Sequence, residues 1–456
     1  MGVVIAYVLF IVLMWLITAY ISQSNKKNKN ENHQNISKTA RSQAHGVIFG
    51  KDKKLSKNVV FSQQNEEGHV LIVGGSGSGK TSAGVIPTLQ SMSQDTCCLC
   101  IDVAGDISTH VKSTNKKIFD LHSTETSNFN FFSEIDKTYS LHEKEALLIE
   151  LASLIVVVDE RSSDVERYYN QSAQTILKSA FLAFYDDFKE NDDYCVIFDF
   201  IAEKSWKQLF KEIDKSNSET AKKLISSFAN NDKLNSESYA TLLREIELFV
   251  CDPVLRPHLR RNEAISAQDV NDKQIYVVIR EHEVTKYAPL LKLITAQVLQ
   301  NIRKRENLVN KNTLMVLDEL SAYGFGLKEL LLDALQRSRK KNVRIMMAVQ
   351  SLSDLHKVFN DNDDVQSALN NCDFTMIMSC NSVADAEACQ KLIGEHTSYT
   401  KSYTKSASGT SVTHSERQDN AVSVTELRAL KADKKLILAH EKGFCRLYKN
   451  FYFENC

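Results

Sequence analysis

Short apolar runs of strand length alternate with longer helical patterns through most of the chain. Six runs consist almost wholly of apolar side chains, which is typical of parallel strands that are buried on both faces of a sheet. These runs are 69–73, 97–103, 274–279, 313–317, 344–349 and 374–378. The pattern therefore predicts an α/β fold with a parallel-type central sheet.

Between residues 141 and 261 the pattern changes to helical spacing, and strand-like runs are nearly absent. Apolar residues recur there at intervals of three and four, as on the buried face of a helix. A clear example is the series Ala173, Ile176, Leu177, Ala180 and Phe184. We therefore predict that 141–261 form an all-α domain inserted into an α/β domain made of 44–140 and 262–456. A Ser/Thr-rich stretch, 397–420, repeats the unit Ser-Tyr-Thr-Lys and predicts a loop or hairpin.

The N-terminal end has the pattern of a membrane anchor. Residues 1–25 carry no charged side chain and are mostly apolar. About 20 such residues match the hydrocarbon core of a bilayer. Basic residues follow at once, at Lys26, Lys27 and Lys29, and the positive-inside rule places them in the cytoplasm. We expect a single-pass helix over 1–25 with its N-terminus outside, a juxtamembrane linker over 26–43 that can touch lipid, and a cytoplasmic body.

Composition excludes some classes of protein. The chain has 456 residues, 43% of them hydrophobic, so it can bury a sizeable core. Its 56 basic and 57 acidic residues give a net charge of −1, which excludes a strongly basic nucleic-acid binder of the histone type. A basic pore lining inside a neutral assembly stays possible. The ten cysteines show no paired zinc-site spacing, and we expect reduced thiols.

The strongest chemical signal is a phosphate-binding loop. Residues 74–81 match the pattern G-x-x-x-x-G-K-[ST], between the predicted strand 69–73 and a helical pattern, which is the context that the motif requires. Glycines let backbone N–H groups wrap a phosphate, and the helix N-terminus adds a positive dipole end. We expect Lys80 to reach the β- and γ-phosphates of ATP and the Thr81 hydroxyl to ligate Mg²⁺. The predicted nucleotide-binding residues are Gly74, Gly75, Ser76, Gly77, Ser78, Gly79, Lys80 and Thr81.

Two acids follow the predicted strand 313–317, as in a Walker B segment. Asp318 is expected to hold the Mg²⁺ through water, and Glu319 to orient or deprotonate the attacking water. Taken alone, these acids could simply face solvent at a strand end. Together with the P-loop, the second carboxylate favours hydrolysis over simple phosphate binding.

Two further positions are candidates for catalysis. Gln350 ends the strand 344–349, where its side chain can sense the γ-phosphate or position water, or merely cap a loop. The basic run 337–344 is either a solvated helix end or a source of cations near a DNA path and of an arginine finger for a neighbour's ATP. Arg339 is the first candidate for that finger.

The order of these segments resembles that of the type IV secretion coupling proteins of the TraG/TraD type, the inner-membrane ATPases of conjugation. The P-loop segment and the helix pattern after it, the Asp-Glu of the Walker B strand and the Val-Gln-Ser at 349–351 all have counterparts in that family. Together the similar segments are 69–89, 102–106, 130–131, 287–298, 316–324, 346–355, 424–430 and 448–453. The resemblance covers most of the chain, from about residue 40 to the end.

The resemblance implies a RecA-like P-loop NTPase domain that assembles as a homo-hexamer with ATP sites between subunits. It implies a bacterial inner membrane location and contact with the components of a type IV secretion channel. It also implies recruitment of a relaxase–DNA complex or of protein substrates, with the all-α domain as the docking element.

Three functions are therefore compared. The first is an ATPase that couples hydrolysis to delivery of a DNA–relaxase complex, and so of single-stranded DNA, to a secretion channel. The second keeps the motor but moves protein effectors, or double-stranded DNA as in FtsK/HerA-type translocases. The third is a membrane receptor that binds nucleotide without hydrolysis, and the intact set of Lys80, Thr81, Asp318 and Glu319 argues against it.

Overall fold

The computed structural model describes residues 37–63, 68–92, 96–103, 105–159, 161–228, 232–306, 311–406, 409–441 and 443–455. The predicted membrane helix, 1–25, and residues 26–36 of the predicted linker lie outside this range. Within the part that is described, no helix is both long and apolar enough to cross a membrane. Residues 37–43, which we assigned to the linker, form strand β1 (Ser37–Ala40) and a 3₁₀ turn, η1 (Arg41–Gln43).

A 12-stranded sheet forms the centre of the molecule, and seven neighbouring strands of it run parallel. Three of the six predicted runs match strands at both ends, and the other three differ by one residue at one end. The parallel strands in spatial order are β12 (Phe374–Ile377), β4 (Val70–Val73), β11 (Val343–Val349), β10 (Thr313–Leu317), β5 (Cys97–Val103), β9 (Gln274–Ile279) and β6 (Lys116–Asp120). The predicted mixed α/β fold with a parallel core is therefore confirmed.

Five antiparallel strands extend the sheet beyond β12, and the apolar pattern did not predict them. They contain a smaller share of apolar residues than the six predicted runs, and they include polar or charged residues. In order from β12 they are β15 (Lys435–His440), β16 (Gly443–Tyr448), β2 (Gly46–Lys51), β3 (Asn58–Gln63) and β1. The N- and C-terminal parts of the described chain thus complete one edge of the same sheet.

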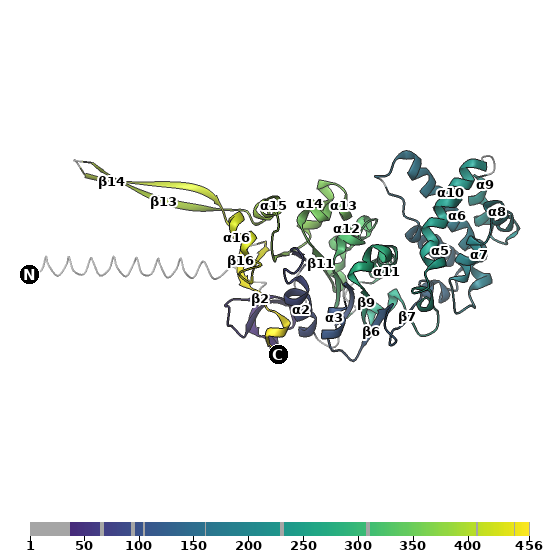
Figure 1. Ribbon diagram of the computed structural model, residues 1–456, viewed down its shortest axis with the longest axis horizontal. Coiled ribbons are helices and arrows are strands. Elements are labelled where there is room, and N and C mark those ends of the chain that lie inside the picture. The colour runs from purple at the N-terminus through teal and green to yellow at the C-terminus, as the bar shows by residue number, and fades with distance from the viewer. Residues whose placement is uncertain are drawn as a thin grey trace, which may run out of the picture.

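Alternate residues of the core strands face two separate hydrophobic clusters, as the pleat of a strand requires. In β11, Ile345 and Met347 face the cluster that contains most of the helices, and Met346 faces the other. Figure 1 shows the two layers, with α12–α14 on one side of the sheet and α2 and α3 on the other. The helices of the first side are α11 (Val284–Lys304), α12 (Lys328–Arg337), α13 (Leu355–Phe359), α14 (Asn362–Asn370), α15 (Val383–Ile393) and α16 (Val424–Ala429).

The second side is covered by a short π-helical turn, η2 (Lys80–Val85), which continues into α2 (Ile86–Ser91), and by α3 (Asp106–His110). Val85, Ile86 and Leu89 pack there against the sheet. The π turn begins with the lysine of the P-loop, so this packing fixes the base of that loop.

The described residues between 141 and 251 form a helical body at the far end of the molecule from the antiparallel strands (Figure 1). Two of its helices begin with capping boxes, in which Ser163 pairs with Glu166 and Ser205 pairs with Gln208. The helices are α5 (Leu141–Ile155), α6 (Asp164–Phe188), α7 (Val196–Ala202), α8 (Trp206–Lys215), α9 (Glu219–Ser226) and α10 (Asp232–Cys251). The chain returns to the sheet through β8 (Ala264–Ile265), which pairs with β7 (Asn128–Phe129).

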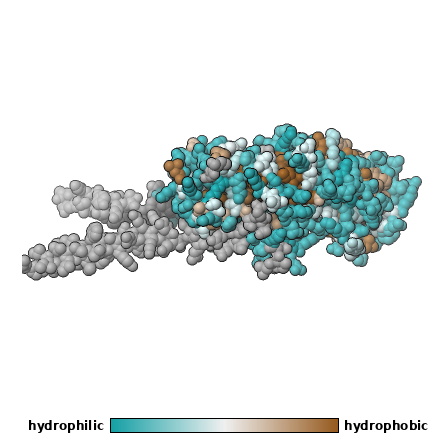
Figure 2. Space-filling model, turned by 90° about the horizontal axis from the view of Figure 1, so that it is seen from below, coloured by the Kyte–Doolittle hydropathy of each residue, from teal (hydrophilic) through white to brown (hydrophobic). Residues whose placement is uncertain are grey.

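The Ser/Thr-rich stretch forms a long hairpin of β13 (Glu395–Ser406) and β14 (Gly409–Asn420). Figure 1 shows it projecting away from the sheet, on the side opposite the helical body. The described surface that Figure 2 shows is mostly hydrophilic, with apolar side chains in small separate spots.

Candidate nucleotide-binding site

The predicted nucleotide-binding and Walker B residues meet at one edge of the sheet. The P-loop follows β4, Asp318 and Glu319 follow β10, and Gln350 follows β11. These three strands are parallel neighbours, so their carboxyl ends lie side by side. Loops at the carboxyl ends of parallel strands are the usual ligand-binding edge of an open α/β sheet.

The P-loop needs its glycines for steric reasons. Gly77 and Gly79 have φ angles of +66° and +96°, in the left-handed region that favours glycine. A Cβ atom on Gly74 would lie 2.6 Å from Ser78 Oγ and 2.8 Å from the Cβ of Met378, so the loop could not close as it does. The loop is also tied by a hydrogen bond from the Ser78 amide to the Gly75 carbonyl, at 3.1 Å.

Polar groups that suit a phosphate line this loop. Ser78 Oγ is buried and has no hydrogen-bond partner among the described residues. The Lys80 side chain is only 6% exposed, and its Nζ donates to the Gly74 carbonyl at 2.8 Å. It also pairs with Glu319 Oε1 at 3.2 Å. A buried hydroxyl without a partner and a buried cation beside it fit the phosphates of a nucleotide.

Thr81 and Asp318 are positioned to share a cation. The Thr81 hydroxyl donates to Asp318 Oδ2 at 3.3 Å. Burial, together with the neighbouring charge of Glu319, raises the pKa of Asp318 to about 7. Within the described ranges no group of three or more His, Cys, Asp or Glu could hold a metal. One carboxylate and one hydroxyl nevertheless suit Mg²⁺, which takes its other ligands from water and phosphate.

Glu319 is held in a conformation that is uncommon for a residue other than glycine. Its φ and ψ angles are 48° and 41°, in the left-handed region. Its Oε2 accepts a hydrogen bond from Gln350 Nε2 at 3.1 Å, while Oε1 contacts Lys80. Backbone strain of this kind is concentrated at functional sites, where it orients a side chain. The carboxylate is thus fixed between the P-loop lysine and the tip of β11.

Arg339 is the one predicted site residue that is not brought to this edge. It lies in a 3₁₀ turn, η7 (Ser338–Lys341), before the amino end of β11, whereas the P-loop lies at the carboxyl ends of the strands. Its guanidinium forms an ion pair with Asp373, which also accepts the Gly68 amide at 2.9 Å. A contact with the nucleotide of its own chain is therefore excluded by its position, and a role in a neighbour's site stays a prediction.

Sequence reasoning missed two residues that hold the loop. Ser379 Oγ accepts the Gly75 amide at 3.1 Å, and Lys431 Nζ donates to the Ser76 carbonyl at 2.9 Å. Ser379 follows the apolar run 374–378, so a polar residue after the next parallel strand was a usable signal. Lys431 is 355 residues from Ser76 along the chain, and no local pattern indicates this contact.

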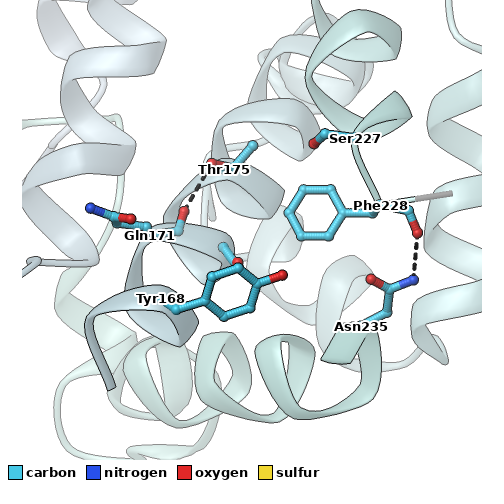
Figure 3. A pocket seen from close by; sticks show the side chains of 7 residues that line it. Tyr168, Gln171, Thr175, Ser227, Phe228 and Asn235 are labelled. Atoms are coloured by element: carbon cyan, nitrogen blue, oxygen red, sulfur yellow. Dashed lines mark hydrogen bonds between the residues drawn. The ribbon is translucent and has the colours of Figure 1, made fainter. Parts of the chain in front are cut away.

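A separate pocket lies in the helical body. Its cavity of about 560 Å³ is lined by two aromatic rings and by uncharged polar side chains. Figure 3 shows that these side chains come from α6, from the turn after α9 and from α10, with Phe228 facing the cavity. Asn235 Nδ2 donates to the Phe228 carbonyl at 2.7 Å and fixes this turn. The lining residues are Tyr168, Gln171, Ser172, Thr175, Ser227, Phe228 and Asn235.

Solved structures share this fold. The chain is similar to the bacterial conjugative coupling protein TrwB lacking 70 N-terminal residues, with a TM-score of 0.68 and 16% identity over 84% of this chain and 85% of that one. TrwB has also been solved with a non-hydrolysable ATP analogue and with ADP and Mg²⁺. VirB4 of Thermoanaerobacter pseudethanolicus is similar at a TM-score of 0.52 and 14% identity, over 89% of this chain and 96% of that one. At these identities the likeness shows the fold alone, and it is the fold of TrwB.

Curated relatives point to the same group of proteins. The type IV secretion system-coupling protein VirD4 of Bartonella quintana (strain Toulouse) is 20% identical over 414 residues, which cover 84% of this chain and 63% of the relative. The VirD4 protein of Bartonella henselae is 21% identical over 353 residues, which cover 72% of this chain and 53% of the relative. The match thus spans less than two thirds of the length of these relatives. The model of the family described as type IV secretory system conjugative DNA transfer matches residues 18–455. The chain therefore belongs to this family, the type IV secretion coupling proteins.

Proposed function

We propose that the protein is a membrane-anchored ATPase that couples ATP hydrolysis to delivery of a DNA–relaxase complex to a type IV secretion channel. The observation that carries this proposal is the convergence of Lys80, Thr81, Asp318, Glu319 and Gln350 at one edge of the sheet. A protein that only bound nucleotide would not need the second carboxylate to lie within reach of the phosphate-binding lysine.

Each of these residues has a separate role in the transfer of the γ-phosphoryl group to water. Lys80 and the P-loop amides hold the β- and γ-phosphates, and Thr81 and Asp318 hold the Mg²⁺. When bound there, that ion would neutralise charge on the phosphate oxygens. Glu319 accepts a proton from the attacking water while the new oxygen–phosphorus bond forms and the bond to the β,γ-bridging oxygen breaks. Gln350 keeps the Glu319 carboxylate oriented through its 3.1 Å hydrogen bond.

The proposed assembly is the one that the family resemblance implies. We propose a homo-hexamer in the bacterial inner membrane, with residues 1–25 as a single-pass anchor whose N-terminus lies outside and with the bulk of the chain in the cytoplasm. In a ring, ATP lies between subunits, so an arginine finger comes from a neighbour. Arg339 stays the first candidate for this role, because its side chain is 43% exposed and lies at the sheet edge away from its own P-loop.

The proposed cargo is a protein joined to single-stranded DNA, and we assign the docking of its protein part to the helical body. Among the described residues that line the pocket in the helical body there is no Lys or Arg, so the pocket suits an uncharged part of a protein rather than a phosphate backbone. We therefore assign it to the protein part of the cargo. Phe228→Ala should leave stimulation of ATP hydrolysis by DNA unchanged; loss of that stimulation would contradict this assignment.

Stimulation of ATP hydrolysis by nucleic acid tests the proposal. The full chain in detergent is assayed without DNA, with single-stranded DNA and with double-stranded DNA, each at two salt concentrations. We expect stimulation by single-stranded DNA that weakens as salt rises, because phosphate contacts release counterions. Hydrolysis that no DNA affects would favour protein effectors as cargo, and a preference for double-stranded DNA would favour an FtsK/HerA-type motor.

A further inference from the structure

The C-terminal segment, residues 424–453, packs against the P-loop. Lys431 lies in the turn after α16, and its Nζ donates to the Ser76 carbonyl at 2.9 Å. A Cβ atom on Gly77 would lie only 3.2 Å from that Nζ, so the ammonium group sits directly against the tip of the loop. This places a second lysine, besides Lys80, at the phosphate-binding loop.

A third lysine approaches the same loop from the end of β16. Lys449 is 3% exposed, and a Cβ atom on Gly79 would lie 3.6 Å from its Cδ and 3.1 Å from Cε1 of Phe451. Its Nζ has one long hydrogen bond, to the Leu430 carbonyl at 3.4 Å. Its side chain therefore runs beside the P-loop and ends next to Lys431.

The described lysines of this segment fall into two kinds. Lys434 pairs with Glu454, and Lys435 pairs with Asp433. Across the described part of the chain, no carboxylate forms an ion pair with Lys431 or Lys449, the two that face the loop. Burial, together with the nearby charge of Lys431, lowers the pKa of Lys449 to about 8. Two neighbouring cations without a carboxylate are unfavourable unless an anion binds between or beside them.

We propose that Lys431 and Lys449 form a second cationic wall of the nucleotide site and bind the polyphosphate of ATP together with Lys80. This inference rests on the proposed nucleotide site. The ligand class is a nucleoside triphosphate, whose charge would compensate the two ammonium groups. Binding of the nucleotide would then draw Lys431 from the Ser76 carbonyl towards a phosphate oxygen and fix the C-terminal segment on the loop.

Nucleotide affinity tests the proposal. The full chain in detergent is titrated with a fluorescent ATP analogue and with ADP, as wild type and as Lys431→Ala. The loss of a charge-assisted hydrogen bond to phosphate should raise the Kd for the ATP analogue about tenfold, and the Kd for ADP by less. The salt dependence of binding should become weaker. Lys434→Ala is the matched control on the same turn, since Lys434 is 62% exposed and pairs with Glu454, and its Kd should equal that of the wild type.

Two variants separate charge from bracing of the loop. Lys431→Gln can still donate to the Ser76 carbonyl but has no charge, so it should bind as weakly as Lys431→Ala. Lys431→Arg should restore affinity. Rescue by Gln would overturn the proposal, because it would show that Lys431 only braces the loop.

Lys449 gives an independent readout. Lys449→Met removes a buried charge, so it should raise the melting temperature of the nucleotide-free protein and lower nucleotide affinity in the same variant. A raised melting temperature with unchanged affinity would contradict its part in the wall. If Lys80→Ala binds ATP as well as the wild type, the proposed site itself fails; if only the Lys431 and Lys449 variants bind normally, this inference fails alone.

Discussion

The Glu319→Gln substitution separates binding from hydrolysis at the proposed site. The glutamine is isosteric and can keep a contact with Gln350, but it cannot accept a proton from water. Loss of a general base costs a factor of about 10² to 10⁴ in rate. We therefore expect kcat for ATP hydrolysis to fall by at least about a hundredfold.

The same substitution should not weaken ATP binding. Glu319 Oε1 lies 3.2 Å from Lys80 Nζ, and Lys80 is 6% exposed. Glu319 therefore competes with the phosphates for this lysine. A hydrogen bond between charged groups contributes about 1.5–3 kcal/mol, and its loss frees Lys80. We expect the Kd for ATP to stay equal or to fall by up to about tenfold, which corresponds to about 1.4 kcal/mol.

Equilibrium binding and single-turnover hydrolysis by the full chain in detergent measure the two effects. Glu329→Gln is the control, because Glu329 is 84% exposed on α12 and the change in net charge is the same. That variant should match the wild type in both assays. If Glu319→Gln hydrolyses ATP at the wild-type rate, Glu319 has no catalytic role. If the substitution greatly weakens ATP binding, the inference that Glu319 competes with the phosphates for Lys80 is wrong.

Three other predictions concern stability and the loop. Burial lowers the pKa of His69 from 6.5 to about 3. Between these two pH values the unfolded state binds a proton that the folded state does not, so the free energy of unfolding should fall as the pH drops below 6.5. His69→Gln should make this fall shallower in denaturant titrations from pH 7 to 4; an unchanged slope would refute the role of His69. Gly79→Ala forces a left-handed φ on alanine at a cost of about 1–2 kcal/mol and crowds Phe451. ATP binding should therefore be lost while the circular dichroism spectrum of the folded protein is retained. Normal ATP binding by this variant would contradict the loop geometry. Arg256 donates to both carboxylate oxygens of Asp199, so Arg256→Ala should destabilise the helical body by about 3 kcal/mol. Lys207 forms an exposed ion pair with Asp232, so Lys207→Ala should cost less than about 1 kcal/mol. Thermal unfolding measures both effects. Equal effects of these two substitutions would refute the stabilising role of the Arg256–Asp199 pair.

The sequence was informative where one physical pattern dominates. Strands buried on both faces are apolar at nearly every position, so 97–103, 274–279 and 313–317 could be predicted to the residue. The P-loop and the two acids of the Walker B segment could be predicted because phosphate binding needs particular residues at fixed spacing. Parallel strands then bring their carboxyl ends together, which explains why Gln350 meets Glu319.

The rest depends on contacts that no local pattern encodes. The strand Asn58–Gln63, which lies between β1 and β2, mixes polar and apolar residues, and its pairing with Gly46–Lys51 depends on the tertiary fold. Arg339 lies in a basic run that fits either end of the sheet, and only the direction of β11 decides its position. Lys431 reaches Ser76 across most of the chain, so its contact could be found only in three dimensions.

The most direct test of the central claim is steady-state, Mg²⁺-dependent ATP hydrolysis by the full chain in detergent, compared with Lys80→Ala over a range of protein concentrations. We expect hydrolysis by the wild type that requires Mg²⁺ and rises more than proportionally with protein concentration as rings assemble, and none by Lys80→Ala. If Lys80→Ala hydrolyses ATP at the wild-type rate, the site at the carboxyl edge of the sheet is not an ATPase centre.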